Sequence, residues 1–276
     1  MENDMKVIQN KSLVILKQLI KIFEENGLTY YLSGGSFLGA VRHEGFIPWD
    51  DDVDISMPRR DYELLLNELS DKIPDNLFLQ NFKTDPQYRY FITRVLDLNF
   101  NVEEVRTGEI THPAVDILPL DGSPNNKMHR KLYFKLMMLN RYLISLSNRD
   151  VIDLKRERGF FESIVVNIAR KIPFEKILRS YNLKLRMEKT MKKYSMEESE
   201  YSGCLMGAYR LRQMVPTSWF GKGKFYNFEG EMLRGPVNYD AYLTQMYSDY
   251  MTFPDLSKIE SKIHYKLVNG GKNDKI

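Results

Sequence analysis

The sequence is poor in cysteine, in long apolar runs and in excess charge of either sign. Its single cysteine, Cys204, excludes a framework of internal disulfides and a cysteine-rich zinc site, and it fits a reducing compartment. No uncharged apolar run approaches the roughly 18 residues of a membrane-spanning helix, and the N-terminal stretch has acids and no long apolar core, unlike a signal peptide. The net charge of +3 is too small to indicate nucleic-acid binding. We therefore expect a cytoplasmic protein that binds no nucleic acid.

Residues 33–57, SGGSFLGAVRHEGFIPWDDDVDISM, concentrate the chemistry of the chain. Four aspartates fall within positions 50–54, and a folded domain rarely builds such a self-repelling cluster unless it holds a cation. Asp52 and Asp54 alternate with apolar neighbours, which predicts a strand whose successive side chains point to opposite faces. The two carboxylates would then face one side and present hard oxygen ligands to Mg²⁺ or Mn²⁺.

A glycine pair opens the same stretch. Residues 29–32 predict a short strand, the following Ser-Gly-Gly-Ser a tight turn, and residues 37–41 the first turns of a helix. Free N–H groups at such a helix N-terminus surround an anion, and glycine permits a close approach. We expect Gly34, Gly35 and Ser36 to hold a donor phosphate. Arg42 is a further candidate because a guanidinium matches phosphate geometry, with an exposed structural arginine as the alternative.

A third carboxylate stands in the apolar segment AVDILPL, residues 114–120. An aspartate inside such a strand is costly unless it has a partner. Asp116 is therefore our candidate for the third catalytic carboxylate, whereas Asp121, which precedes a glycine, fits an ordinary turn. Together these residues indicate metal-dependent phosphoryl transfer.

The run GGSFLGAVRHEGFIPWDDDVDI resembles the signature of the LicD family, within the nucleotidyltransferase superfamily; fukutin-type transferases are more distant relatives. That superfamily pairs a Gly-Gly or Gly-Ser turn with an Asp-x-Asp strand and a third carboxylate on a neighbouring strand. The resemblance thus implies that Asp52, Asp54 and Asp116 are catalytic and bind metal. It also implies an α/β (α+β) nucleotidyltransferase-like fold, in which a small mixed sheet has flanking helices and an additional helical region.

The resemblance implies a reaction as well. The group transferred would be a phospho-substituent, foremost phosphocholine from CDP-choline, and CMP would be released. The acceptor would be a sugar hydroxyl of a cell-surface glycan, free or lipid-linked, such as teichoic acid, lipopolysaccharide or capsule. Transfer of glycerol or ribitol phosphate from a CDP donor is an alternative, and so is a true nucleotidyltransferase that releases pyrophosphate.

A non-enzymatic alternative is a metal-binding scaffold module built on the DDDVD loop. The loop lacks the spacing of an EF-hand, however. Such a module would also leave the glycine pair and Asp116 unexplained.

The C-terminal part resembles the family in a second pattern: a Phe-Glu-Gly element, a proline, a Tyr-Asp pair and a Tyr-Gly-Asp-Tyr run. The matching positions are Phe228, Glu229, Gly230, Pro236, Tyr239, Asp240, Leu243, Tyr247, Asp249 and Tyr250. Ser248 stands where the family usually has glycine, and serine is tolerated in most turns that need no positive φ.

A choline donor would require aromatic rings around its quaternary ammonium. The candidate rings for substrate contacts, in and beside the motifs, are Trp49, Trp219, Tyr239, Tyr247 and Tyr250, with an acid such as Glu229 or Asp249 nearby. The alternative for each ring is ordinary core packing.

We divide the chain into a nucleotidyltransferase-like catalytic core at 1–123, a helical region at 124–215 and a C-terminal region at 216–276 that completes the site. Outside the motifs, the sequence pattern predicts strands at 77–81, 88–97, 101–106 and 114–120. Apolar spacing predicts helices over 5–26, 58–73 and, in the middle region, about 124–147, 155–171, 173–194 and 197–209. Basic residues cluster in this middle region, which usually marks a solvated helix face. Peripheral contact with the inner membrane surface is the functional alternative.

Overall fold

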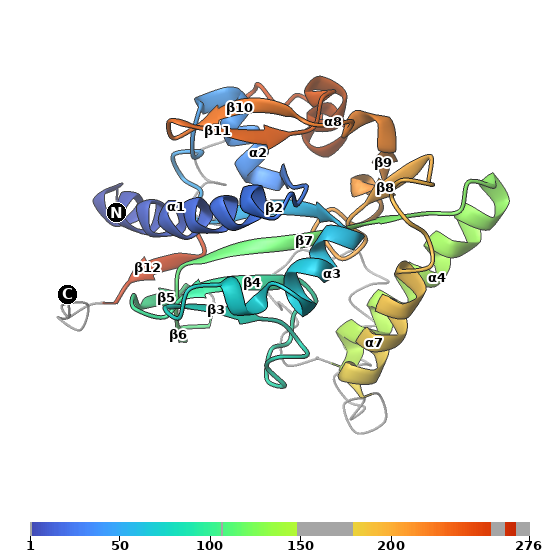
Figure 1. Ribbon diagram of the computed structural model, residues 1–276, viewed down its shortest axis with the longest axis horizontal. Coiled ribbons are helices and arrows are strands. Elements are labelled where there is room, and N and C mark those ends of the chain that lie inside the picture. The colour runs from blue at the N-terminus through green and yellow to red at the C-terminus, as the bar shows by residue number, and fades with distance from the viewer. Residues whose placement is uncertain (1, 106, 148–178, 255–262, 269–276) are drawn as a thin grey trace.

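The computed structural model describes the chain except for residues 1, 106, 148–178, 255–262 and 269–276. Figure 1 shows a mixed α/β fold, with helices around a central sheet and two long helices at one end. Within the described ranges we find no helix with the length and apolarity that crossing a bilayer requires.

The main sheet contains one parallel pair of strands. Its strand order is β1 (Tyr31–Leu32), β2 (Val53–Pro58), β7 (Ala114–Gly122), β4 (Thr93–Asp97) and β3 (Leu77–Gln80). β2 and β7 run parallel, whereas the other neighbours are antiparallel. All nine residues of β7 are buried, as expected for an apolar central strand.

Smaller sheets and helices surround these strands. β8 (Tyr201–Gly203) pairs with the end of β7 and with β9 (Val215–Pro216); β10 (Lys224–Phe228) and β11 (Glu231–Gly235) form a hairpin; β12 (Tyr265–Leu267) joins β5 (Val102–Glu104) and β6 (Ile110–Thr111). The α-helices are α1 (Glu2–Glu25), α2 (Gly34–His43), α3 (Arg59–Asn67), α4 (Lys127–Ser147), α7 (Ser180–Met191) and α8 (Tyr239–Tyr247). Short 3₁₀ turns lie at Ser70–Lys72, Arg210–Gln213 and Thr217–Trp219.

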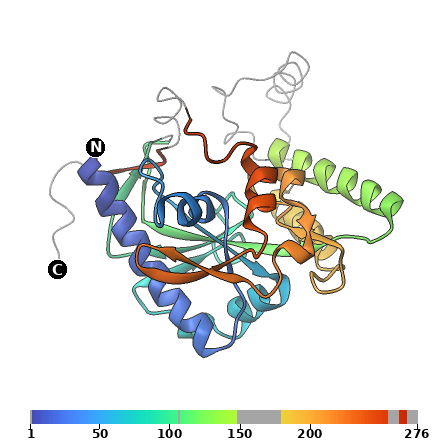
Figure 2. The same cartoon turned by 90° about the horizontal axis from the view of Figure 1, so that it is seen from above.

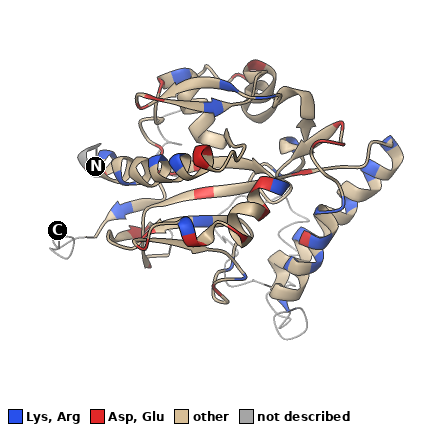
Figure 3. Cartoon of the chain, viewed as in Figure 1, with Lys and Arg blue, Asp and Glu red and all other residues tan. Residues whose placement is uncertain are grey.

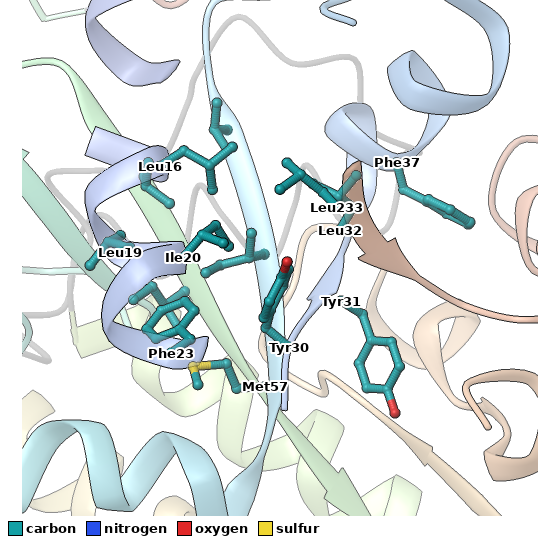
Figure 4. Close-up of a cluster of buried hydrophobic side chains, with 14 of the residues drawn as sticks. Leu16, Leu19, Ile20, Phe23, Tyr30, Tyr31, Leu32, Phe37, Met57 and Leu233 are labelled. Carbon is teal, nitrogen blue, oxygen red and sulfur yellow. The ribbon is translucent and has the colours of Figure 1, made fainter. Parts of the chain in front are cut away.

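The main core joins both ends of the chain. Figure 4 shows Leu16, Leu19 and Phe23 of α1 beside the strands. The rings of Phe23 and Tyr30 pack with their centroids 5.7 Å apart. Phe228, Leu233 and Leu243 of the C-terminal part belong to the same core. The three-part division stays a prediction, but residues from its first and third parts are packed together.

A second core lies between α4 and α7. It buries Tyr133 and Met137 of α4 against Met187 and Met191 of α7, together with Leu205. Figure 2 shows that this helix pair lies at the end of the molecule away from the N-terminus. Within the described residues, these helices confirm the helical character predicted for much of the middle region.

Part of the predicted secondary structure is wrong. Residues 197–209 do not form a helix, because Ser202 and Gly203 add a strand to the end of β7 and Gly203 packs closely on the backbone of Gln213. Residues 88–92 are not in a strand, since β4 begins only at Thr93. The helix predicted at 155–171 lies outside the described residues.

Candidate active site

Asp54 and Asp116 lie side by side on the two parallel strands. In the register of β2 and β7, Asp54 is the partner of Asp116. Asp52 immediately precedes β2, and Val53 and Ile55 are fully buried. The alternation predicted from the sequence is thus confirmed, and all three carboxylates line one cavity of about 550 Å³.

The glycine pair places the N-terminus of α2 directly against these carboxylates. Gly34 has φ of +54°, and a Cβ atom there would collide with the carboxylate of Asp54. A Cβ atom on Gly35 would collide with the carboxylate of Asp50. Gly34 is therefore favoured by its positive φ as well as by the close approach, and a side chain at position 35 would displace the Asp50 carboxylate. The first N–H groups of α2, which have no partner within the helix, lie beside the acids.

Hydrogen bonds fix this turn to β2. The backbone N–H of Ser33 donates to the carbonyl of Asp54 at 3.0 Å, and the backbone N–H of Asp54 donates to the Ser36 hydroxyl at 2.9 Å. Ser36 is buried and does not line the cavity. Its observed contact therefore positions Asp54, and its direct contact with phosphate stays a prediction.

Burial and mutual repulsion disfavour the charged form of two acids in the carboxylate cluster. Burial raises the pKa of Asp54 well above its ordinary value, and the charges of Asp52, Asp116 and Asp50 raise it further. Burial likewise raises the pKa of Asp52, against the opposing effect of His264. A cation bound among these oxygens would relieve both effects.

Asp116 has a cationic partner of its own. Arg94 on β4 donates from Nε to Oδ1 of Asp116 at 2.8 Å. Burial alone would lower the pKa of Arg94, but the charge of Asp116 outweighs it and raises that pKa well above the ordinary value. Arg94 therefore stays charged, and it orients Asp116 from the neighbouring strand.

The C-terminal segment contributes a residue that sequence reasoning missed. The buried carboxylate of Asp51 accepts hydrogen bonds from the backbone N–H groups of His264 (2.8 Å) and Tyr265 (2.7 Å), and lies 2.9 Å from Nδ1 of His264. This side-chain hydrogen bond raises the pKa of His264 to about 9 although burial opposes it. Asp51 thus ties the end of the chain to the acidic loop, across a separation that leaves no local sequence signal.

A cation fits this group of side chains. Among the described residues, Asp50, Asp52 and His264 offer three ligand atoms that all lie within 4.8 Å of one another. The trio that the sequence predicted, Asp52, Asp54 and Asp116, is not gathered that closely, since Asp116 is turned onto Arg94. Carboxylate oxygens favour hard divalent ions such as Mg²⁺ or Mn²⁺, and Nδ1 of His264 is already engaged with Asp51.

The cavity brings together most of the residues predicted for the site. Besides the three acids, its lining includes Gly34, Gly35, Arg42, Trp49, Asp249 and Tyr250. Arg42 donates from Nε to His43 (2.9 Å) and from Nη1 to the carbonyl of Tyr250 (2.8 Å). Arg42 therefore links the two motifs as well as lining the cavity.

Three of the predicted substrate contacts lie elsewhere. Glu229 accepts a hydrogen bond from the backbone N–H of Phe46 at 3.1 Å, so it supports the connector that precedes the acidic loop. The rings of Tyr239 and Tyr226 pack with their centroids 6.2 Å apart, and Trp219 packs against the main core. None of the three is among the residues that line the cavity.

Aromatic rings form part of the cavity wall. Trp49, Tyr247 and Tyr250 come from the motifs, and Tyr209 joins them from a segment that no motif marks. Tyr209 and Tyr247 contact edge to face at 5.3 Å. Asp249 adds a carboxylate to the same wall, and its Oδ2 accepts a hydrogen bond from Thr252 at 2.6 Å.

The turn after α8 departs from what its sequence favours. Ser248 has φ of 63° and ψ of −112°, a conformation that suits glycine. This turn therefore needs the positive φ that lies outside the range in which we expected serine to be tolerated. Tyr247, Asp249 and Tyr250 around this turn all line the cavity, so the strain lies directly beside the site.

Comparison with known proteins agrees with the resemblance seen in the sequence. Residues 27–155 match the family described as LicD/FKTN/FKRP, nucleotidyltransferase domain. The chain is 25% identical over 246 residues to the lipopolysaccharide cholinephosphotransferase LicD of Haemophilus influenzae. The aligned stretch covers 88% of this chain and 89% of that protein. A shorter match, 46% identical over 41 residues, is to the human ribitol 5-phosphate transferase FKRP, and it spans 15% of this chain and 8% of that protein.

Proposed function

We propose that this chain, which contains a LicD-family domain across residues 27–155, transfers a phospho-substituent from a CDP-linked donor to a sugar hydroxyl of a cell-surface glycan. We favour phosphocholine as the group transferred, CDP-choline as its donor and CMP as the leaving group. The register of Asp54 against Asp116, beneath the Gly34–Gly35 turn in a single cavity, is the observation that carries this proposal. The relative named lipopolysaccharide cholinephosphotransferase, which aligns with 88% of this chain, supports the acceptor class and the head group.

In this proposal the catalytic centre lies between β2, β7 and the start of α2. Asp52 and Asp54 would hold Mg²⁺ or Mn²⁺, with Asp50 and His264 beside Asp52. When bound, the ion neutralises charge that develops on the phosphate being transferred and on the leaving group. The N–H groups of Gly34 and Gly35, at the positive end of α2, orient the donor phosphate.

Asp116 faces the same cavity from β7 and has one of two roles. It either completes the metal site or takes the proton from the attacking sugar hydroxyl. Arg94 holds the Asp116 carboxylate in place through the 2.8 Å hydrogen bond, and Ser36 fixes the backbone of Asp54 in the same way. The nucleotidyltransferase-like fold belongs to this proposal, supported by the family description and by the paired carboxylates on neighbouring strands.

The aromatic wall supports a cationic head group. Trp49, Tyr209, Tyr247 and Tyr250 line the same cavity as Asp52 and Asp54. Each ring face that meets a quaternary ammonium contributes roughly 0.5–2 kcal/mol, and Asp249 adds a negative charge. Two such faces would favour choline over an uncharged polyol by about tenfold or more.

A phosphopolyol donor is the second candidate. The match to the ribitol 5-phosphate transferase FKRP favours it, although that match spans only 41 residues. A nucleotidyltransferase that releases pyrophosphate uses the same carboxylates and differs in its product. Cytoplasmic localisation stays a prediction from the composition.

A donor panel tests the proposal. The protein is incubated with Mg²⁺, a glycan acceptor and, in turn, CDP-choline, CDP-ethanolamine, CDP-glycerol and CDP-ribitol, and CMP release is measured. We expect acceptor-dependent CMP release that is fastest with CDP-choline. Trp49→Leu or Tyr247→Leu should reduce the preference for choline, whereas Tyr239→Leu, outside the cavity, is the matched control. Pyrophosphate release from CTP, or equal rates with all four donors, would contradict the assignment.

A further inference from the structure

The outer face of α4 exposes an apolar stripe. Met128, Leu132, Leu136, Leu139 and Tyr142 are spaced by three or four residues, which places them on one face of the helix. Their exposed fractions range from 41% to 77%, and Met128 (77%) and Leu132 (67%) are the most exposed large apolar side chains in the described part of the chain.

Packing of the described residues does not account for this stripe. The opposite face of α4 carries Tyr133, Met137 and Ile144, which are buried in the second core with α7. α4 is therefore apolar on two faces, and one of them covers no described part of the molecule. A contiguous exposed apolar surface of this kind usually marks an interaction site.

Cations accompany the stripe along the whole helix. The sequence of α4 contains five lysines and arginines and no acid, and Figure 3 shows these charges recurring along it. Arg130 and Arg141 have internal partners: Arg130 pairs with Glu200 at 3.3 Å, and Arg141 donates to the carbonyl of Leu205 at 2.5 Å. The other three, Lys127, Lys131 and Lys135, are exposed and four residues apart, so they form one edge of the apolar stripe.

We propose that α4 docks on an anionic lipid bilayer through this face, with its axis in the plane of the membrane surface. We call the surface formed by Met128, Leu132, Leu136, Leu139, Tyr142, Lys127, Lys131 and Lys135 the docking face. An apolar stripe with lysines at its edge matches an interfacial helix, whose apolar side chains enter the acyl boundary while its lysines meet anionic headgroups. The uniform positive charge favours an anionic surface over a second copy of the same face, which would repel it.

The docking face is connected to the catalytic cavity. Arg141 donates to the carbonyls of Leu205 (2.5 Å) and Gly207 (3.0 Å), and Met206 and Gly207 line the cavity. Docking of α4 would therefore hold the cavity wall at a fixed place relative to the lipid surface. Docking of α4 on lipid needs neither the donor nor the acceptor of the proposed reaction.

Vesicle co-sedimentation tests the docking face directly. The full chain is mixed with phosphatidylcholine vesicles that contain or lack phosphatidylglycerol, without donor or acceptor, and the bound fraction is measured. We expect binding that requires phosphatidylglycerol and weakens with salt. The double variant Lys131→Gln, Lys135→Gln should weaken vesicle binding about fivefold for each lysine. The double variant Met128→Ser, Leu132→Ser should weaken vesicle binding at least tenfold.

Matched variants elsewhere serve as controls. The double variant Lys17→Gln, Lys21→Gln removes the same charge from α1. The double variant Phe225→Ser, Met232→Ser removes exposed apolar side chains from the β10–β11 hairpin. Neither control should change vesicle binding. CMP release with a soluble acceptor should be normal in the α4 variants, which separates failure of docking from failure of the proposed reaction. If the serine variant unfolds, the lysine variant decides.

Three results would overturn the proposal. One is no binding to phosphatidylglycerol vesicles, and another is binding that the α4 variants leave unchanged. The third is a wild-type dimer in gel filtration that the serine variant dissociates while vesicle binding persists, because the docking face would then join two copies of the chain.

Discussion

Two groups of buried and partly buried acids lie near the parallel strands β2 and β7, and their charges are balanced in different ways. At the far end of β7, Asp121 accepts two hydrogen bonds from Arg59, from Nε at 2.7 Å and from Nη2 at 2.6 Å. Glu63 and Glu188 join this group, and Lys192 and Lys83 lie 2.8 Å and 2.7 Å from them. Three acids thus meet three cations of the chain itself.

The cluster at the proposed catalytic centre behaves differently. Asp116 pairs with Arg94 and Asp51 with His264, but Asp52 and Asp54 stay under mutual repulsion in a buried place. The pKa values respond accordingly. Burial acts to raise the pKa of Glu63, but Lys192 and Arg59 outweigh it and the pKa is lowered, whereas those of Asp52 and Asp54 are raised. We call the first group the closed network, because its acids are paired with cations of the chain. We call the second group the open cluster, because the charge of Asp52 and Asp54 is disfavoured there and a bound cation would relieve it.

The largest expected effect comes from the open cluster. Asp54→Asn should reduce turnover by about a thousandfold or more, because it removes an oxygen ligand and charge at the centre of the site. The same change should not lower the metal-free melting temperature, since it relieves repulsion from Asp52 and Asp116. CMP release and thermal unfolding of one preparation measure both, and turnover close to wild type would remove Asp54 from the metal site.

The closed network should respond in the opposite way. Arg59→Met leaves the buried carboxylate of Asp121 without its partner and should cost roughly 3–5 kcal/mol of unfolding free energy, measured by urea denaturation. Adding Asp121→Asn should recover part of the loss. Turnover per folded molecule should hardly change, and a loss of turnover without a loss of stability would show that the network belongs to the site.

Part of the fold and of the site could be predicted from the sequence because the relevant signals are local. The alternation around Asp52 and Asp54 indicated their common face, and the apolar surroundings of Asp116 identified it as an acid with a partner. The glycine pair predicted a helix N-terminus beside the acids, although α2 already begins at Gly34 and not after the predicted turn. The helices of the first 70 residues followed from apolar spacing in the same way. Each of these inferences needed only a few neighbouring residues.

The rest depends on contacts across the chain. Arg94 and Asp116 meet because their strands pair, and Asp51 meets His264 across 213 positions, so no window of sequence contains either relation. Residues 201–203 form a strand because the end of β7 needs a hydrogen-bonding partner, which local helical spacing does not reveal. Glu229 stood in a matching motif, but its side chain accepts a hydrogen bond from the backbone N–H of Phe46 and its own backbone N–H donates to the carbonyl of Glu44, so it supports the connector.

The protonation of His264 should make the unfolding free energy depend on pH. Its folded-state pKa of about 9 exceeds the ordinary value near 6.5, so its contribution to stability is complete below pH 6.5 and is lost as the pH rises through 9. The side chain is half exposed, so we expect a loss of about 1 kcal/mol after solvent screening. Urea denaturation at pH 6.5 and pH 9 should show a smaller decrease for His264→Gln than for wild type, and equal decreases would mean that the pair with Asp51 adds nothing.

The smallest effect concerns the backbone beside the cavity. Ser248→Gly should stabilise the fold by about 1 kcal/mol, because glycine adopts the observed positive φ without strain. Ser145→Gly, on the exposed surface of α4, is the matched control and should destabilise by a similar amount. Thermal unfolding measures the change in stability of each variant. A loss of stability in Ser248→Gly, as in Ser145→Gly, would show that Ser248 is not strained.

Calorimetric titration of Mg²⁺ into the metal-free protein tests the contrast between the two acidic groups most directly. We expect saturable binding by the wild-type protein and loss of that binding in the double variant Asp52→Asn, Asp54→Asn. Binding should be unchanged in Glu63→Gln, whose carboxylate belongs to the closed network. At a free concentration one hundred times the dissociation constant, the ion should stabilise the wild-type fold by about 2.7 kcal/mol. Binding that survives in the Asp52→Asn, Asp54→Asn protein, or that disappears in Glu63→Gln, would contradict the assignment of the open cluster as the catalytic metal centre.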